Sequence, residues 1–205
     1  MLKKIIILII ISLGIIISIF LCKLEILYNK KNADLLVSTE SCGGLTVFAT
    51  CSKEYYIINS KDGRRKHISS KMLHSISFSS PKGEEKIKKN ISQLNADFTH
   101  RINIFGWLDE STVIFGKIKN FDFGYEVYRY DINTNKYKFL MYEKNSTSCV
   151  AGKGKFFCIV SIVSEDSARD LKDAIYKYDI NTFKKTKVGV YKTGAATLKL
   201  EKILK

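Results

Sequence analysis

Proline is nearly absent from this chain of 205 residues, which contains one proline and twelve glycines. That composition leaves little room for a flexible low-complexity linker. Hydrophobic residues make up 45% of the chain and charged residues 26%, as in folded globular proteins. We therefore expect one domain with a core of its own, or two very small ones.

Catalytic and nucleotide-binding motifs are also missing. The chain has no His-Glu-x-x-His, no Gly-x-Ser-x-Gly and no Gly-x₄-Gly-Lys-Ser/Thr segment. It has no Cys-x₂-Cys pair, and its three histidines lie apart from the cysteines, so the sequence predicts no metal site and no cofactor. Residues 152–155, Gly-Lys-Gly-Lys, are too short for a phosphate-binding loop and predict a hairpin turn.

Acidic residues are few compared with basic ones. Lys and Arg number 34 against 20 Asp and Glu, which gives a formal net charge of +14. An excess of this sign favours acidic partners such as nucleic acid, anionic lipid or an anionic envelope polymer. The lysines are scattered rather than clustered, and a dispersed, solvated lysine surface is the alternative.

The longest uncharged run lies at the N-terminus. Residues 5–21 are mostly isoleucine and leucine, and Cys22 extends the run to 18 residues. This length is near the lower limit for crossing a bilayer and exceeds the core of a cleaved signal peptide. We expect residues 1–22 to form an uncleaved signal anchor, followed by a juxtamembrane segment (23–41) and an ectodomain (42–205). A cleaved signal peptide is the alternative, and lysines on both sides of the run leave the orientation open.

Four further cysteines form two pairs with the same spacing. Cys42 and Cys51 are nine residues apart, as are Cys149 and Cys158, with glycines between the members of each pair. The two segments look like the same hairpin repeated. Four cysteines can pair in three ways, and we expect each nearby pair to form a disulfide that closes a β-hairpin. Free buried thiols are the alternative. Disulfides would place residues 23–205 in the periplasm or outside the cell, on a single-pass protein of the inner or plasma membrane.

A nine-residue segment occurs twice and indicates a β repeat. Residues 128–136 read Tyr-Arg-Tyr-Asp-Ile-Asn-Thr-Asn-Lys and residues 176–184 read Tyr-Lys-Tyr-Asp-Ile-Asn-Thr-Phe-Lys. Each copy alternates apolar and polar side chains and ends in a turn-forming Asp-Ile-Asn-Thr. A fainter copy combines residues 46–49, 55–60 and 64–68 in the same order of apolar strand, aromatic strand, polar turn and basic strand. The two copies are 48 residues apart, and a period of this size is typical of repeated β units such as propeller blades.

The segment between the fainter copy and the copy at residues 128–136 predicts a helix. Residues 81–95 begin with proline after serine, carry acids in the first turn and repeat apolar residues at helical spacing. We expect this amphipathic helix to lie on the sheets. A shorter helix is predicted over residues 165–174.

The residues that precede the copy at 128–136 resemble a known family. Residues 107–115, Trp-Leu-Asp-Glu-Ser-Thr-Val-Ile-Phe, precede Tyr-x-Tyr-Asp and a polar turn, as in the repeat of TolB-type exported β-propellers. Residues 78–83 are also similar to a Ser-Pro-Asp-Gly turn of that family. The resemblance covers residues 42–192 and implies a mainly β fold of propeller-like, repeated antiparallel hairpin sheets. With about three units, where propellers have 4–8 blades, we expect a small or incomplete propeller, an open set of hairpin sheets, or half of an oligomeric ring.

We expect the domain to be a membrane-anchored protein-binding or scaffolding module of the cell envelope, with an envelope protein as its partner and a homo-oligomer left open. Toxin neutralisation is a variant of this function, and cleavage of an envelope glycan by acidic loop residues is the alternative. Export argues against nucleic acid as a ligand. The candidate partner-binding loops contain Asp109, Glu110, Asn133, Glu165 and Asp166. Trp107 could flank a ligand pocket, although core packing is the more usual role of a tryptophan.

The C-terminal residues 197–204 begin as an alternating strand. This strand either pairs with an earlier strand, so that partners must use the loops, or remains free as an edge to which a partner can add a strand.

Overall fold

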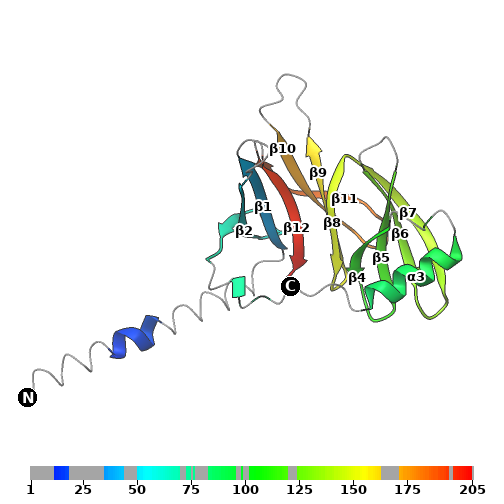
Figure 1. The fold of residues 1–205 in the computed structure, drawn as a ribbon, viewed down its shortest axis with the longest axis horizontal. Coiled ribbons are helices and arrows are strands. Elements are labelled where there is room, and N and C mark those ends of the chain that lie inside the picture. The colour runs from blue at the N-terminus through cyan, green and yellow to red at the C-terminus, as the bar shows by residue number, and fades with distance from the viewer. Residues whose placement is uncertain are drawn as a thin grey trace, which may run out of the picture.

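The computed structural model describes residues 12–18, 35–43, 50–69, 73–74, 76, 83–95, 98, 102–119, 124–162, 171–193 and 196–204. This part of the chain is mainly β (Figure 1). It contains helix α3 (Glu84–Leu94) and the strands β1 (Leu35–Gly43), β2 (Thr50–Ile58), β3 (Arg65–His67), β4 (Ile102–Trp107), β5 (Thr112–Ile118), β6 (Gly124–Asp131), β7 (Lys136–Lys144), β8 (Ser146–Gly152), β9 (Lys155–Ile162), β10 (Lys172–Tyr178), β11 (Lys185–Lys192) and β12 (Thr197–Ile203).

The strands form three antiparallel sheets of four strands each. Sheet A has the order β12-β1-β2-β3, sheet B the order β4-β5-β6-β7 and sheet C the order β8-β9-β10-β11. Sheets B and C are simple meanders of consecutive hairpins, as the repeated sequence predicts. Sheet A differs because its first strand, β12, comes from the C-terminal end of the chain.

The repeated turns have the same hydrogen bonds. Asp131 Oδ1 accepts from the backbone N–H groups of Asn133 and Thr134, at 2.9 and 3.0 Å. Asp179 Oδ1 accepts in the same way from the residues at 181 and 182. In the fainter copy, Asn59 Oδ1 accepts from the N–H of Lys61 at 2.9 Å. All three turns end in a left-handed residue, namely Gly63, Asn135 and Phe183. The three-copy repeat is therefore present in the structure.

The strand that pairs with the aromatic strand of the fainter copy begins earlier in the chain than residue 46. Residues 46–49, expected to form it, lie outside the described residues, and the strand that pairs with β2 is β1, beginning at Leu35. The reason is burial, because Leu35, Leu36 and Val37 are fully buried. The β structure thus starts before residue 42, the boundary that we expected for the ectodomain.

Sheet C lies between sheets A and B (Figure 1). One buried cluster, which includes Leu35, Ile58 and Ile175, joins sheet A to sheet C. A second cluster, which includes Ile114 and Phe156, joins sheet B to sheet C. Since side chains alternate between the faces of a strand, each end sheet also has an outer face to cover.

Residues that follow β3 in the chain pack on the outer faces of sheets A and B. On sheet A, Ile68 and Ile76 pack over Leu36 and Ile57. On sheet B, Ile87, Ile91 and Phe98 pack over Val113, Phe115 and Tyr130. The predicted amphipathic helix is therefore confirmed, as α3, with its apolar side on sheet B. Among the described residues the strands form three separate antiparallel sheets and none of these sheets is closed, so the expected mainly β fold of antiparallel hairpin sheets is confirmed.

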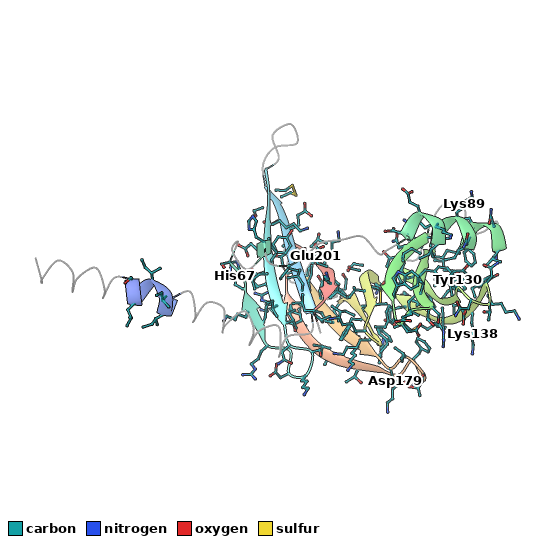
Figure 2. All side chains as sticks on the ribbon, turned by 90° about the horizontal axis from the view of Figure 1, so that it is seen from below. His67, Lys89, Tyr130, Lys138, Asp179 and Glu201 are labelled. Carbon is teal, nitrogen blue, oxygen red and sulfur yellow. A yellow bond between two sulfur atoms is a disulfide. The ribbon has the colours of Figure 1, made fainter. Side chains whose placement is uncertain are left out.

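The C-terminal strand pairs with an earlier one. β12 lies antiparallel to β1, with Val37 opposite Leu200 and Glu40 opposite Thr197. Glu201 Oε1 reinforces the pairing by accepting from Ser38 Oγ at 2.7 Å and pairing with Lys53 Nζ at 2.8 Å; Figure 2 labels Glu201 at this place. β12 is therefore structural.

Both expected disulfides are present. Cys42 bonds Cys51 and Cys149 bonds Cys158, with Cα–Cα distances of 4.0 and 4.1 Å. The expectation that they close equivalent hairpins was wrong. Cys42–Cys51 joins the second and third strands of sheet A, whereas Cys149–Cys158 joins the first and second strands of sheet C. The first bridge is exposed, while Cys158 is fully buried.

The shorter predicted helix is not confirmed. Most of residues 165–174 lie outside the described residues, and the helix prediction is wrong for residues 172–174, which belong to β10. Here Asp173 and Ala174 are buried and pair with both β9 and β11, so sheet pairing decides the conformation.

Residues 12–18 form a helix whose side chains are all exposed, including Ile16 at 63% exposure. The other residues of the expected signal anchor lie outside the described part of the chain. Among the described residues, no helix is both long enough and apolar enough to cross a membrane.

Candidate functional site

A groove of about 710 Å³ lies between α3 and the turn that joins β4 to β5. Its floor is apolar and its rim carries charges of both signs. The lining residues are Gly83, Lys86, Ile87, Asn90, Trp107, Leu108, Asp109, Glu110, Ile132 and Lys153.

Three turns meet at this groove and are bonded to one another through the backbone. The N–H of Ile132, in the β6–β7 turn, donates to the carbonyl of Ser111 in the β4–β5 turn at 2.9 Å. The N–H of Gly154, in the β8–β9 turn, donates to the carbonyl of Leu108 at 2.9 Å. Residues from sheets B and C are thus held on one side of the groove, opposite α3.

Asp109 holds its own turn together. Its Oδ1 atom accepts from the N–H and Oγ of Ser111 and from the N–H of Thr112, at 2.9, 3.1 and 2.7 Å. The hydrogen bond from the N–H of Ser111 is the main reason that the pKa of Asp109 lies below its usual value. Asp109 is therefore ionised at neutral pH and is unsuited to be the general acid of a glycan hydrolase.

The charged rim comes from three separate elements. Lys86 lies on α3, Glu110 lies beside Asp109 in the β4–β5 turn, and both side chains are exposed. Lys153 approaches from the β8–β9 turn and donates through Nζ to the carbonyl of Leu204 at 3.1 Å. A ligand in the groove would therefore meet two ammonium groups as well as carboxylates.

Trp107 belongs both to the packed core and to the lining of the groove. It packs against the cluster beneath α3, and it also lines the groove. Its indole Nε1 is buried and has no hydrogen-bond partner among the described residues. The two roles considered from the sequence, core residue and wall of a pocket, are therefore combined.

The predicted loop residues are brought together only in part. Asp109 and Glu110 line the groove, and Asn133 is exposed in the turn immediately after the lining residue Ile132. Glu165 and Asp166 lie outside the described residues. Sequence reasoning missed the residues from α3 and the β8–β9 turn, because no local signal indicates which sheet the helix covers.

One group of metal-ligand atoms occurs elsewhere, at Glu40, Cys42 and Cys51, within 4.8 Å of one another. The two sulfur atoms are bonded to each other in the disulfide, so they offer no thiolate to a metal.

No protein family and no curated protein matches this chain. One solved structure is similar, the Pyrococcus horikoshii acylaminoacyl peptidase, at 13% sequence identity and a TM-score of 0.33. The match covers 80% of this chain and 26% of that one, so the chain spans about a quarter of the peptidase. A likeness of this size carries no functional argument, and the resemblance to TolB-type propellers stays a prediction.

Proposed function

We propose that this protein is a membrane-anchored binding module of the cell envelope, and that a partner protein docks an apolar segment into the groove between α3 and the β4–β5 turn. The observation that carries the proposal is the groove itself, with an apolar floor and a mixed-charge rim. Its volume is in the range of pockets that hold compact ligand groups or side chains.

The pairing of β12 favours the groove over a sheet edge as the docking site. A free terminal strand would offer backbone N–H and C=O groups to a partner's strand along both edges. One edge of β12 is paired with β1, and on the other edge the N–H of Leu200 donates to Ser148 Oγ at 3.1 Å. With β12 paired, we expect a partner to bind through the loops. The groove lies beside two of the three predicted loop regions, at Asp109 and Asn133. An apolar anchor in a pocket with a polar rim is typical of protein–protein hot spots.

Export and anchoring rest on two observations. The uncharged run over residues 5–21 includes the helix over residues 12–18, whose apolar side chains have no cover in the structure. The two disulfides are typical of an oxidising compartment. We further propose that residues 1–22 are a single-pass anchor and that the three sheets are an open, propeller-like fan. In this arrangement the first strands of two sheets are neighbours, and the N–H of Leu200 on β12 donates to Ser148 Oγ on β8.

A photo-crosslinking residue at position 110 of the full chain, in its native membrane, tests the docking site. We expect a crosslinked partner from position 110 and none from position 199, which is exposed on β12. Ile132→Asp places a charge on the groove floor and should abolish the crosslink. Ile180→Asp is the matched control, because Ile180 holds the same place in the repeated turn but does not line the groove. Equal crosslinking from position 199, or no effect of Ile132→Asp, would refute the docking site.

A reporter fused after Lys205 tests the anchor separately. We expect reporter activity only outside the cytoplasm, and we expect Ile16→Asp, in the middle of the uncharged run, to abolish that activity. A reporter that is active in the cytoplasm would contradict export.

A further inference from the structure

Each sheet has one edge strand opposite its first strand, namely β3 in sheet A, β7 in sheet B and β11 in sheet C. We call these three the outer strands, and their exposed charged side chains are all basic. β3 carries Arg65 and Lys66, and all basic side chains of the other two outer strands are exposed as well. These are Lys136, Lys138 and Lys144 on β7, and Lys185, Lys187 and Lys192 on β11. The one acidic residue in these strands, Glu143, is buried, and its Oε1 lies 3.2 Å from Lys185 Nζ.

The three outer strands form a connected surface. At one end of β11, Tyr191 Oη donates to the carbonyl of Gly63, in the turn that leads to β3, at 2.9 Å. At the other end, the ion pair between Lys185 and Glu143 joins β11 to β7. Figure 2 shows this side of the molecule, with His67 of β3 and Lys138 of β7 on either side of the sheet that leads to Asp179. We call this surface, β3–β11–β7, the basic belt.

Acidic residues in the turns beside the belt are already engaged. Asp62 accepts from Arg64 Nε at 2.7 Å, and Asp179 accepts from the backbone of its own turn. The belt therefore presents a cationic field, in which the one acidic side chain of the outer strands, Glu143, pairs with Lys185.

Edge protection explains part of this pattern, because lysines on exposed edge strands prevent pairing with other sheets. It does not explain why three separate outer strands, joined into one surface, expose basic residues and no acidic residue. A continuous cationic surface of this kind is complementary to an array of anionic groups.

We propose that the basic belt docks onto anionic phospholipid headgroups of the membrane in which the N-terminal segment is anchored. This inference rests on the anchor of the proposed function. The twelve residues between the proposed anchor (1–22) and β1 could span at most about 40 Å, enough for the domain to turn its belt toward the bilayer. Since the Debye length is about 8 Å at physiological salt, the belt must lie close to the headgroups, and docking must weaken as salt rises.

The full chain in lipid nanodiscs tests the proposal, with energy transfer from Trp107, the single tryptophan, to dansyl-labelled headgroups as the measurement. We expect stronger transfer in discs that contain anionic phospholipid than in zwitterionic discs, and loss of this gain at high salt. Lys187→Glu with Lys192→Glu should abolish the gain. Lys89→Glu with Lys199→Glu is the matched control, because it makes the same change in charge at exposed positions on α3 and β12, and it should leave the gain intact.

Equal transfer in both lipids, or equal loss in the two double variants, would overturn the belt proposal while leaving the anchor standing. A chain that enters neither type of disc would instead refute the anchor. In that case the full chain is added to preformed vesicles. Salt-sensitive binding to anionic vesicles that Lys187→Glu with Lys192→Glu abolishes would still support the belt, and no binding would overturn it.

Discussion

Tyr191 donates a hydrogen bond of 2.9 Å from its hydroxyl group to the backbone carbonyl of Gly63, across 128 positions of the chain. The bond joins the outer strand of sheet C to the β2–β3 turn of sheet A. Burial raises the pKa of Tyr191 to about 12, so the hydroxyl group remains a donor at physiological pH.

Gly63 is the residue of this contact that we expect to tolerate substitution least. Its φ is 69°, and a Cβ atom there would overlap the carbonyl oxygen of Val188. Gly63→Ala should therefore lower the free energy of unfolding by more than about 2 kcal/mol, since left-handed strain alone costs about 1–2 kcal/mol. Gly154→Ala is the control, with φ at 68° and open space around the new methyl group. Urea unfolding followed by circular dichroism measures both, and equal losses would show that the overlap is relieved cheaply.

The two disulfides should differ in their accessibility to reductant. Cys42 and Cys51 are exposed, whereas Cys158 is fully buried between β8 and β10. Brief treatment of the native protein with a small thiol, followed by alkylation and peptide mapping, should label Cys42 and Cys51 first. Unfolding in urea before the treatment should remove the difference. Earlier labelling of Cys149 and Cys158 in the native protein would contradict the burial.

β12 should be required for folding. Leu200 is 4% exposed and packs in the core between sheets A and C, so Leu200→Ala should cost about 2–5 kcal/mol. Lys199→Ala, on the opposite and exposed side of the same strand, should change stability by less than about 0.5 kcal/mol. Deletion of residues 197–205 should leave a chain that proteases degrade rapidly. A deletion variant that folds and loses only partner binding would make β12 a docking strand instead.

Asp173 should make the domain less stable as the pH rises. Burial raises the pKa of this carboxyl group in the folded state, although Ser161 Oγ donates to it at 2.8 Å. The unfolded chain therefore loses its proton first, and stability falls as the pH rises from the usual value near 3.8 through the raised folded pKa. Asp173→Asn removes this titration.

We expect the stability of Asp173→Asn relative to the wild type to increase over that pH range and then to become constant. Urea unfolding of both proteins at a series of pH values measures the difference. Carboxylates with a lowered pKa, such as Asp109, act in the opposite direction, because they stabilise the fold above their unfolded pKa and lose that effect in acid. Their contribution is the same in both proteins and cancels in the comparison. A difference that does not change with pH would contradict the assignment to Asp173.

The hairpins, their turns and both cysteine pairings were predictable from the amino-acid sequence because each depends on residues close together in the chain. Asp131 and Asp179 form their turns with N–H groups two and three residues away, and Cys42 meets Cys51 across a hairpin. The alternation of apolar and polar residues likewise predicted that 128–131 and 176–178 would be strands.

Tertiary structure alone decided which segments meet across long stretches of chain. Residues 172–174 read as helical, but pairing with β9 and β11 makes them a strand. β12 completes sheet A because its buried leucines fit the core between sheets A and C, a contact with no local signature. The groove exists because α3 covers sheet B and because the β8–β9 turn bonds to Leu108, so residues from three distant segments surround Asp109. Local preferences specify each hairpin, whereas only the burial of apolar faces by distant segments specifies how the hairpins and the helix are assembled.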